Sequence, residues 1–312
     1  IFCKDGGHIY ENQTGDAACD QYHRYKEDVQ IMKEMGMKAY RFSLSWARIM
    51  PEGTGTVNEK GLKYYDNLIN ELLDNGIEPF VTLYHWDLPY ALHLQGGWMN
   101  PNSPSWFYEY AKVVAEHFSD RVKNFFTINE PQCIVGLGYQ TGEHAPGLKV
   151  GPSDYFRIWH NVLKAHGRAV EALREFSKQP VKISMAPCGA LYVPETNKPE
   201  DIEAARKANF SLPENSIGAC SWDVALCCDP VYLGQYPEDI LKEFGQFFPK
   251  VTDADMKLIS QPLDFYGQNI YNAVTVRAGE DGKAVRAARY DGFPQTAIGW
   301  PVTPEVLYWA PK

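Results

Sequence analysis

The sequence lacks several features that would each define a class of protein. No run approaches the roughly 18 consecutive apolar residues that a membrane-spanning helix needs. Basic residues number 30 against 39 acidic ones, and the net charge is -9. This balance argues against a nucleic-acid partner, because phosphate binding needs clustered Lys and Arg. No Gly-x-Gly-x-x-Gly or Walker-type loop follows a predicted strand, so a nucleotide-binding fold loses support.

The cysteines are odd in number and irregular in spacing. They form no Cys-x-x-Cys pair of the kind that holds zinc. Several stand beside apolar residues, as buried free thiols do. We therefore expect free thiols, no metal site and a reducing, cytoplasmic compartment. The seven positions are Cys3, Cys19, Cys133, Cys188, Cys220, Cys227 and Cys228.

Short β-branched and aromatic runs alternate with longer helical patterns along the chain. The runs predict strands over residues 38–45, 79–85, 122–128, 181–186 and 265–271. Apolar spacing predicts helices over residues 22–35, 58–75, 104–119, 153–176, 201–209 and 237–244. Such alternation implies a parallel sheet with right-handed crossovers, and no linker divides the chain. We predict a single α/β domain over residues 1–312, built as a (β/α)₈ TIM barrel.

Polar and aromatic residues gather where the predicted strands end. In a barrel of this kind the active site is built at the C-terminal ends of the strands. Glu130 is the sharpest candidate, because the Pro131 that follows it should stiffen the backbone and favour an extended geometry. Taken singly, each candidate also has a structural reading: Glu130 could cap a helix, His85 could be a core histidine, and Trp86 could serve packing. The candidates are Arg41, His85, Trp86, Asn129, Glu130, Asn269 and Tyr271.

A set of short motifs, in a fixed order along the whole chain, resembles the family 1 glycoside hydrolases, the β-glucosidase family. Asn-Glu-Pro alone is a weak signal, whereas the full set is highly specific. The motifs are Tyr22-His-Arg-Tyr-Lys-Glu-Asp28, Tyr40-Arg-Phe-Ser-Leu-Ser-Trp46, Tyr84-His-Trp-Asp-Leu-Pro89, Gly96-Gly-Trp98, Thr127-Ile-Asn-Glu-Pro131, Asp229-Pro230 with Gly234-x-Tyr-Pro237, and Asp264-Phe-x-Gly-x-Asn-x-Tyr271.

The resemblance implies a retaining mechanism that uses two carboxyl groups and needs neither a cofactor nor a metal ion. Glu130 matches the general acid/base of that mechanism. His85 and Asn129 match residues that bind hydroxyls of the sugar, and Trp86 matches part of the subsite wall. Arg41 and Tyr271 match the pair that orients the nucleophile, and Asn269 lies near the same spot. We also expect Asn269 and Tyr271 to bind the substrate. The implied substrates are β-D-glucosides or cello-oligosaccharides.

The 312 residues depart from the family pattern in one respect. The family nucleophile lies in a Thr-Glu-Asn-Gly segment on the seventh strand, and these residues do not contain it. By this alignment residues 38–45 are the second strand and residues 265–271 the sixth. We therefore expect strands 1, 7 and 8 to be missing, the natural protein to be longer, and residues 1–312 alone to show no ordinary retaining turnover.

The resemblance leaves other functions open. A 6-phospho-β-glycosidase remains a candidate, because its phosphate-binding residues would lie in the absent eighth-strand loop. A non-catalytic, glycosidase-like binding protein would fit a chain with one catalytic carboxylate. A thioglucosidase is disfavoured, because that class has Gln where this chain has Glu130. Assembly into a homo-oligomer stays open.

Overall fold

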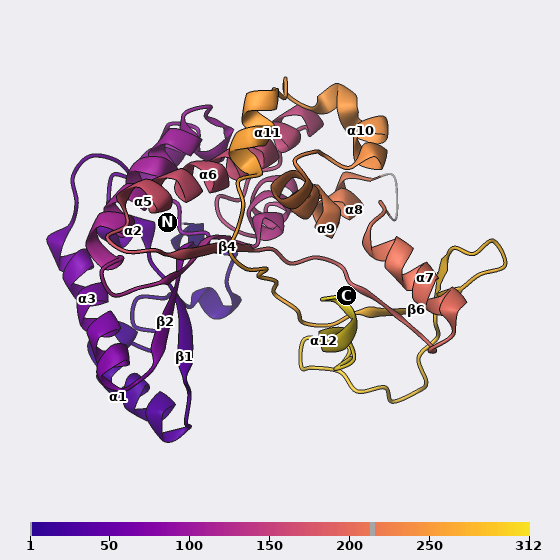
Figure 1. Ribbon diagram of the computed structural model, residues 1–312, viewed down its shortest axis with the longest axis horizontal. Coiled ribbons are helices and arrows are strands. Elements are labelled where there is room, and N and C mark those ends of the chain that lie inside the picture. Colours follow the sequence, from indigo (N-terminus) through magenta and orange to yellow (C-terminus); the bar gives the residue numbers. More distant parts are fainter. Residues whose placement is uncertain (1, 213–215) are drawn as a thin grey trace.

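The computed structural model describes residues 2–212 and 216–312 (Figure 1). Its strands are β1 (Ala39–Ser43), β2 (Glu78–Tyr84), β3 (Asn124–Asn129), β4 (Lys182–Ala186), β5 (Tyr192–Pro194), β6 (Val274–Ala278) and β7 (Ala284–Arg286). Its α-helices are α1 (Gln21–Glu34), α2 (Trp46–Ile49), α3 (Glu59–Asp74), α4 (Tyr90–Leu94), α5 (Ser103–Phe118), α6 (Pro152–Phe176), α7 (Pro199–Asn209), α8 (Ile217–Ser221), α9 (Val224–Cys228), α10 (Glu238–Phe244), α11 (Asp253–Ile259) and α12 (Val306–Trp309). The short 3₁₀-helices are η1 (Phe2–Lys4), η2 (Tyr10–Asn12), η3 (Gly97–Met99) and η6 (Gly245–Phe247), and the π-helices are η4 (Cys133–Thr141) and η5 (Asp229–Leu233). None of the helices in the described ranges is long and apolar enough to cross a membrane.

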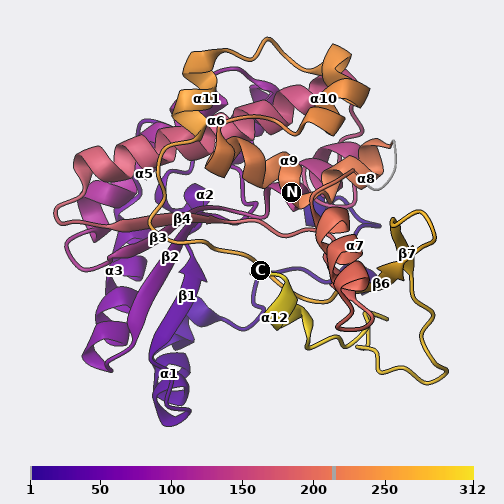
Figure 2. The same cartoon turned by 45° about the vertical axis from the view of Figure 1, so that its right-hand side comes forward.

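Strands β1 to β4 form one parallel sheet in the order of the chain. Helix α3 connects β1 to β2, α5 connects β2 to β3, and α6 connects β3 to β4. These helices cover one side of the sheet, as the two views in Figures 1 and 2 show. Every residue of β3 is buried, because this strand has neighbours on both edges and a helical layer on one face. This part of the chain has the strand–helix alternation of a (β/α)₈ barrel.

The predicted helices are confirmed to within a residue or two at each end. The residues predicted to begin and end these helices have the expected conformations and contacts. The side chain of Asn58 accepts a hydrogen bond of 3.2 Å from the backbone N–H of Lys60 at the start of α3. Gly76, which follows α3, has a φ of 71°, in the left-handed region that ends helices.

The strand predicted over residues 265–271 does not form. This segment runs beside β4, but only two backbone hydrogen bonds join them, from Asp264 N–H to the carbonyl of Ile183 and from Asn269 N–H to that of Pro187. The carboxylate of Asp264 takes the N–H of Ile183 at 2.8 Å, so a side chain occupies a donor that a ladder would use. The prediction of a fifth strand in this sheet was therefore wrong.

The residues between β4 and Tyr271 were predicted to contain at least two helices, and the described part of this stretch, without residues 213–215, contains five α-helices, α7 to α11. A small second sheet was not predicted. Strand β5 pairs in parallel with β6, and β6 pairs antiparallel with β7. Both β5 and β7 are only three residues long, too short for a clear alternating pattern in the sequence.

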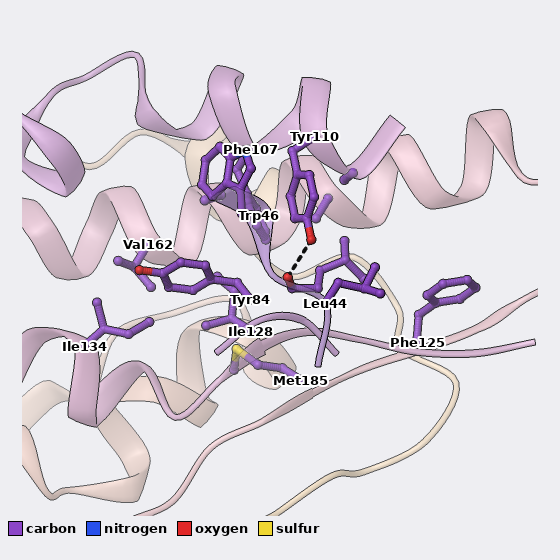
Figure 3. Packing of buried hydrophobic residues seen from close by; sticks show 14 of the residues in the cluster. Leu44, Trp46, Tyr84, Phe107, Tyr110, Phe125, Ile128, Ile134, Val162 and Met185 are labelled. Atoms are coloured by element: carbon purple, nitrogen blue, oxygen red, sulfur yellow. Dashed lines mark hydrogen bonds between the residues drawn. The ribbon is translucent and has the colours of Figure 1, made fainter. Parts of the chain in front are cut away.

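An aromatic cluster fills the space between the sheet and helix α5 (Figure 3). Trp46 is fully buried and stacks on Tyr110 with a centroid distance of 5.1 Å. The hydroxyl of Tyr110 donates to the carbonyl of Leu83 on β2 at 2.9 Å, which ties the helix to the strand. The indole N–H of Trp98 donates to the hydroxyl of Tyr84 at 3.2 Å. These polar tips are satisfied inside the core, so the cluster fixes the top of β2, where the candidate residues begin.

Helix α6 approaches α11 closely at Gly167. A Cβ at this position would collide with the backbone carbonyl of Leu258, which is a rigid neighbour. We expect Gly167→Ala to lower the free energy of unfolding by about 1–3 kcal/mol, because the two helices must move apart. Urea denaturation checks this, with Gly245→Ala as the control. Gly245 has a helical φ of -53° and open space around it, so that change should be neutral or slightly stabilising. An equal loss in both variants would contradict the steric explanation.

Candidate active site

The candidate residues come from four segments of chain that meet at the C-terminal edge of the sheet. Arg41 lies on β1, His85 directly follows β2, and Asn129 is the last residue of β3. Residues Asn269 and Tyr271 come from the irregular segment beside β4. Parallel strands present their carboxyl ends at one edge of a sheet, so the meeting of Arg41, His85 and Asn129 follows from the topology. The approach of Asn269 and Tyr271 depends instead on the path of the segment after α11.

The side chain of Asn129 is the centre of the network. Its Oδ1 accepts hydrogen bonds from Arg41 Nη2 at 2.7 Å and from Asn269 Nδ2 at 2.9 Å. These two donors fix the orientation of the amide, so its Nδ2 faces His85 Nε2 at 3.1 Å as a donor. The carbonyl of Asn129 accepts from the indole N–H of Trp86 at 2.8 Å. The side-chain amide of Asn129 thus orients three neighbours, and its backbone carbonyl orients Trp86.

His85 is held as a neutral ring by its neighbours. Since its Nε2 accepts from Asn129, its proton sits on Nδ1 and points to Ser43 Oγ at 3.1 Å. Partial burial and the nearby guanidinium of Arg41 lower the pKa of His85. Its ring also packs on Trp86 with a centroid distance of 4.7 Å.

The carboxylate of Glu130 is 3% exposed and accepts three hydrogen bonds. Its Oε1 accepts from Asn269 Nδ2 at 2.6 Å and from the hydroxyl of Tyr271 at 2.8 Å. Its Oε2 accepts from the thiol of Cys133 at 3.1 Å. Burial, followed by Glu130 itself, raises the pKa of Tyr271, which keeps the phenol protonated as a donor. The carboxylate therefore has a defined position without an ion pair.

The backbone at Glu130 corrects the expectation drawn from Pro131. Its φ is 43°, in the left-handed region, and not extended. Its N–H still pairs with the carbonyl of Ala186 on β4 at 2.8 Å, while its own carbonyl accepts from Cys133 N–H at 3.0 Å as η4 begins. Residues 131–132, just before η4, are already helical, so the chain leaves the strand conformation at Glu130 alone, and the left-handed conformation achieves the turn. Trp86, at the corresponding place after β2, has a φ of 81°. Such residues store about 1–3 kcal/mol of strain each and cluster at functional sites.

Arg41 donates only to neutral acceptors. Its three nitrogen atoms bond to Thr82 Oγ1 at 3.0 Å, Asn269 Oδ1 at 3.0 Å and Asn129 Oδ1 at 2.7 Å. Its guanidinium also lies 4.5 Å from the ring centroid of Phe126. Within residues 2–212 and 216–312 it forms no ion pair with a carboxylate. Burial lowers its pKa, although Glu130 acts in the opposite direction. A half-buried cation without an anion is a ready binding place for a negative group.

The predicted site residues are thus brought together in one hydrogen-bonded network, and their expected roles stay predictions. Tyr271 was predicted to act with Arg41 on the nucleophile, and in this structure its hydroxyl donates to Glu130. Trp86 was predicted as a subsite wall, and it lines a cavity of 360 Å³ beside the network. His144 and Cys133 line the same cavity.

Sequence reasoning missed the neighbours that complete the site. Cys133 and Cys188 lie with Glu130 in a group whose ligand atoms could hold a metal ion. Cys188 stands just beyond the end of β4, so the strand-end rule could have found it. Cys133 had no signal of its own, because its place depends on the turn at Glu130.

The chain is similar in sequence and in structure to known glycoside hydrolases. The sequence profile described as Glycosyl hydrolase family 1 matches residues 1–309. Beta-glucosidase A from Thermotoga maritima is 43% identical over 313 residues, which cover 100% of this chain and 67% of that protein. Beta-glucosidase A from Acetivibrio thermocellus is 43% identical over 312 residues, covering 98% of this chain and 67% of the relative. The solved structure of the family 1 β-glucosidase from Thermotoga maritima in complex with isofagomine lactam superimposes with a TM-score of 0.84 at 42% identity, over 99% of this chain and 67% of that one. The chain belongs to glycosyl hydrolase family 1.

Proposed function

We propose that the protein is a retaining β-glucosidase in which Glu130 is the general acid/base. Relatives that cover the whole of this chain are named β-glucosidase A and, at 41% identity from Thermotoga neapolitana, 1,4-beta-D-glucan glucohydrolase. The chain spans about two thirds of their length. The proposed substrates are aryl β-D-glucosides and cello-oligosaccharides.

The observation that carries the proposal is a buried carboxylate, fixed by three donors, beside a guanidinium that forms no ion pair within the described ranges. A general acid must be held within hydrogen-bond reach of the departing oxygen, and it must take a proton back from water in the second step. Asn269 and Tyr271 restrain one oxygen of Glu130, so rotation of the carboxylate is limited. Among the described residues, its other oxygen meets only the weak thiol donor of Cys133, which a substrate can displace.

Arg41 is proposed to receive the second carboxylate. In a retaining enzyme the two carboxyl groups lie about 5–5.5 Å apart across the anomeric carbon. A carboxylate that paired with Arg41 would stand next to Glu130, because Asn269 bonds to both residues, and Asn129, which bonds to Arg41, directly precedes Glu130 in the chain. The guanidinium would hold that carboxylate ionised, as attack on the sugar requires.

The sugar is proposed to bind against Asn129, His85 and Trp86. The amide and the imidazole offer oriented polar groups for hydroxyls, and the indole offers an apolar face for C–H groups. Hydrogen bonds to the 2-hydroxyl strengthen at the oxocarbenium-like transition state, and Asn129 is the residue proposed to make them.

The test is the stereochemistry of the first product. The assay uses a polypeptide that carries these residues together with a carboxylate in the Thr-Glu-Asn-Gly position. We expect NMR to detect β-glucose before its anomer, with an aryl β-D-glucoside as substrate. Matched aryl β-D-galactoside and 6-phospho-β-D-glucoside should be cleaved more slowly. A preference for the phosphorylated sugar, or sugar binding without any turnover, would overturn the proposal.

The hydrogen bond from Tyr271 to Glu130 should contribute directly to turnover. We expect Tyr271→Phe to lower kcat by about 10- to 100-fold with a smaller change in KM, because a hydrogen bond to a charged group is worth about 1.5–3 kcal/mol. Steady-state kinetics checks this, with Tyr290→Phe as the control. Tyr290 is 68% exposed, packs on Phe293 and takes no part in the hydrogen-bonded network of the site, so that variant should keep full activity. If only KM changes for Tyr271→Phe, the phenol serves binding and not the acid/base.

A further inference from the structure

Two thiols lie beside the proposed acid/base and share its burial. Glu130, Cys133 and Cys188 each offer one ligand atom, and these atoms lie within 4.8 Å of one another. The three residues are 3%, 7% and 4% exposed. They come from the residue after β3, the first residue of η4 and the segment after β4. The fold therefore brings Cys188 to a pair of residues, Glu130 and Cys133, that are already neighbours in the sequence.

The chemistry of the cluster suits a thiophilic divalent cation. Two sulfur atoms and one carboxylate oxygen match the ligands that Zn²⁺ and Cd²⁺ prefer. Tetrahedral Zn²⁺, with sulfur at about 2.3 Å and oxygen at about 2.1 Å, separates its ligands by about 3.5–3.8 Å. Cys133 Sγ and Glu130 Oε2 are already 3.1 Å apart. Side-chain rotation alone can thus complete the coordination, with the fourth position left for water.

The surroundings of the cluster supply an outer shell and an entry route. Gln132 is fully buried, and its Oε1 accepts from the backbone N–H of Cys188 at 3.3 Å. Its Nε2 is buried without a hydrogen-bond partner among the described residues, which leaves an amide donor beside the cluster for a metal-bound water. Cys133 also lines the 360 Å³ cavity, so an ion can reach the thiol of Cys133 through it.

We propose that Glu130, Cys133 and Cys188 form a site for a thiophilic divalent cation, and that its occupation switches off the acid/base. Binding releases the two thiol protons and forms two metal–sulfur bonds and one metal–oxygen bond. The lone pairs of Glu130 that would carry the catalytic proton are then held by the ion. The inhibitory half of this proposal rests on the proposed function, whereas the binding half does not.

The binding test uses Cd²⁺ and the ultraviolet charge-transfer band of cadmium thiolates. The fully reduced protein carries Cys3→Ser and Cys19→Ser, which remove the exposed thiols. We expect one Cd²⁺ per chain and an intensity that corresponds to two thiolates. Cys188→Ala should raise the Kd for Cd²⁺ by about 100-fold or more, since even loss of an outer-shell partner weakens metal sites by about 10- to 100-fold. Cys133→Ala should do the same, which keeps the test valid if one variant misfolds. Cys220→Ala, a buried thiol elsewhere, should leave the Kd unchanged.

The activity test separates the two proposals. Cd²⁺ should inhibit aryl β-glucoside hydrolysis reversibly, and the half-inhibitory concentration should rise in Cys188→Ala by the same factor as the Kd. An unchanged Kd in both Cys188→Ala and Cys133→Ala would overturn the metal site. Tight binding with the two-thiolate spectrum, in a protein that hydrolyses no glycoside, would support the site and refute the proposed function. Equal inhibition of the control and Cys188→Ala would refute the inhibitory role of the site.

Discussion

Replacement of Glu130 by Gln should lower kcat/KM for substrates with poor leaving groups by about 10²- to 10⁴-fold, the range that general acid–base catalysis supplies. Gln has the same shape, and its amide oxygen can still accept from Asn269 and Tyr271, so the site should stay assembled. Only the transferable proton is lost. Activated aryl glucosides, whose leaving groups need little protonation, should be cleaved in the first step at a rate close to that of the parent enzyme.

The measurement is a comparison of kcat/KM across aryl glucosides of graded leaving-group pKa. The parent enzyme should show a shallow dependence and Glu130→Gln a steep one. Glu143→Gln, the same change at an exposed position beyond η4, serves as the control and should match the parent. An equal loss for good and poor leaving groups would count decisively against Glu130 as the acid.

The second large effect concerns stability below neutral pH. His166 is fully buried on α6, with its Nδ1 at 2.7 Å from Thr127 Oγ1 and no hydrogen-bond partner at Nε2 within the described part of the chain. Burial lowers its pKa from 6.5 to about 4. Above pH 6.5 the ring is neutral in both the folded and the unfolded state, so burial of His166 causes no loss of folding stability there. Between pH 6.5 and about 4 only the unfolded chain binds the proton, and about 3 kcal/mol of stability is lost.

The check is the difference in free energy of unfolding between the parent and His166→Gln, measured in urea at pH 7 and pH 5. The parent should lose about 2 kcal/mol more than the variant over this interval. The pH dependence of the unfolding free energy must be compared between the parent and the variant, because Asp87 and Asp223 change that free energy in the opposite direction in both proteins. Burial raises the pKa of each to about 6, so they favour the folded state as the pH falls from 6 towards 3.8. Parallel pH profiles for parent and variant would refute the role of His166.

The sequence predicted most of the elements, because local signals agree with the final packing. Helix α3 has a capping Asn, a strong apolar face and a terminal Gly, and its bounds were nearly right. The strand expected over residues 265–271 failed for a tertiary reason. The ladder position at Ile183 is taken by the carboxylate of Asp264, and no pattern of hydrophobicity reports such a competition.

For the site, the strand-end rule and the family motifs predicted which residues meet, and the structure supports that grouping. They could not predict the partners of each atom. Tyr271 belongs to an irregular segment, and the path of this segment brings the Tyr271 hydroxyl within hydrogen-bond distance of Glu130. Likewise the thiols of Cys133 and Cys188 are 55 positions apart, so spacing could not reveal their meeting.

The left-handed backbone at Glu130 has a consequence for how the protein can change over generations. This conformation suits Gly or Asn better than a residue with a long side chain. A substitution to Gly would relax the turn and remove the carboxylate in one step. Selection for thermal stability therefore favours replacement of Glu130, whereas selection for catalysis favours its retention. The strained turn persists only while turnover outweighs the gain in stability that its loss would bring.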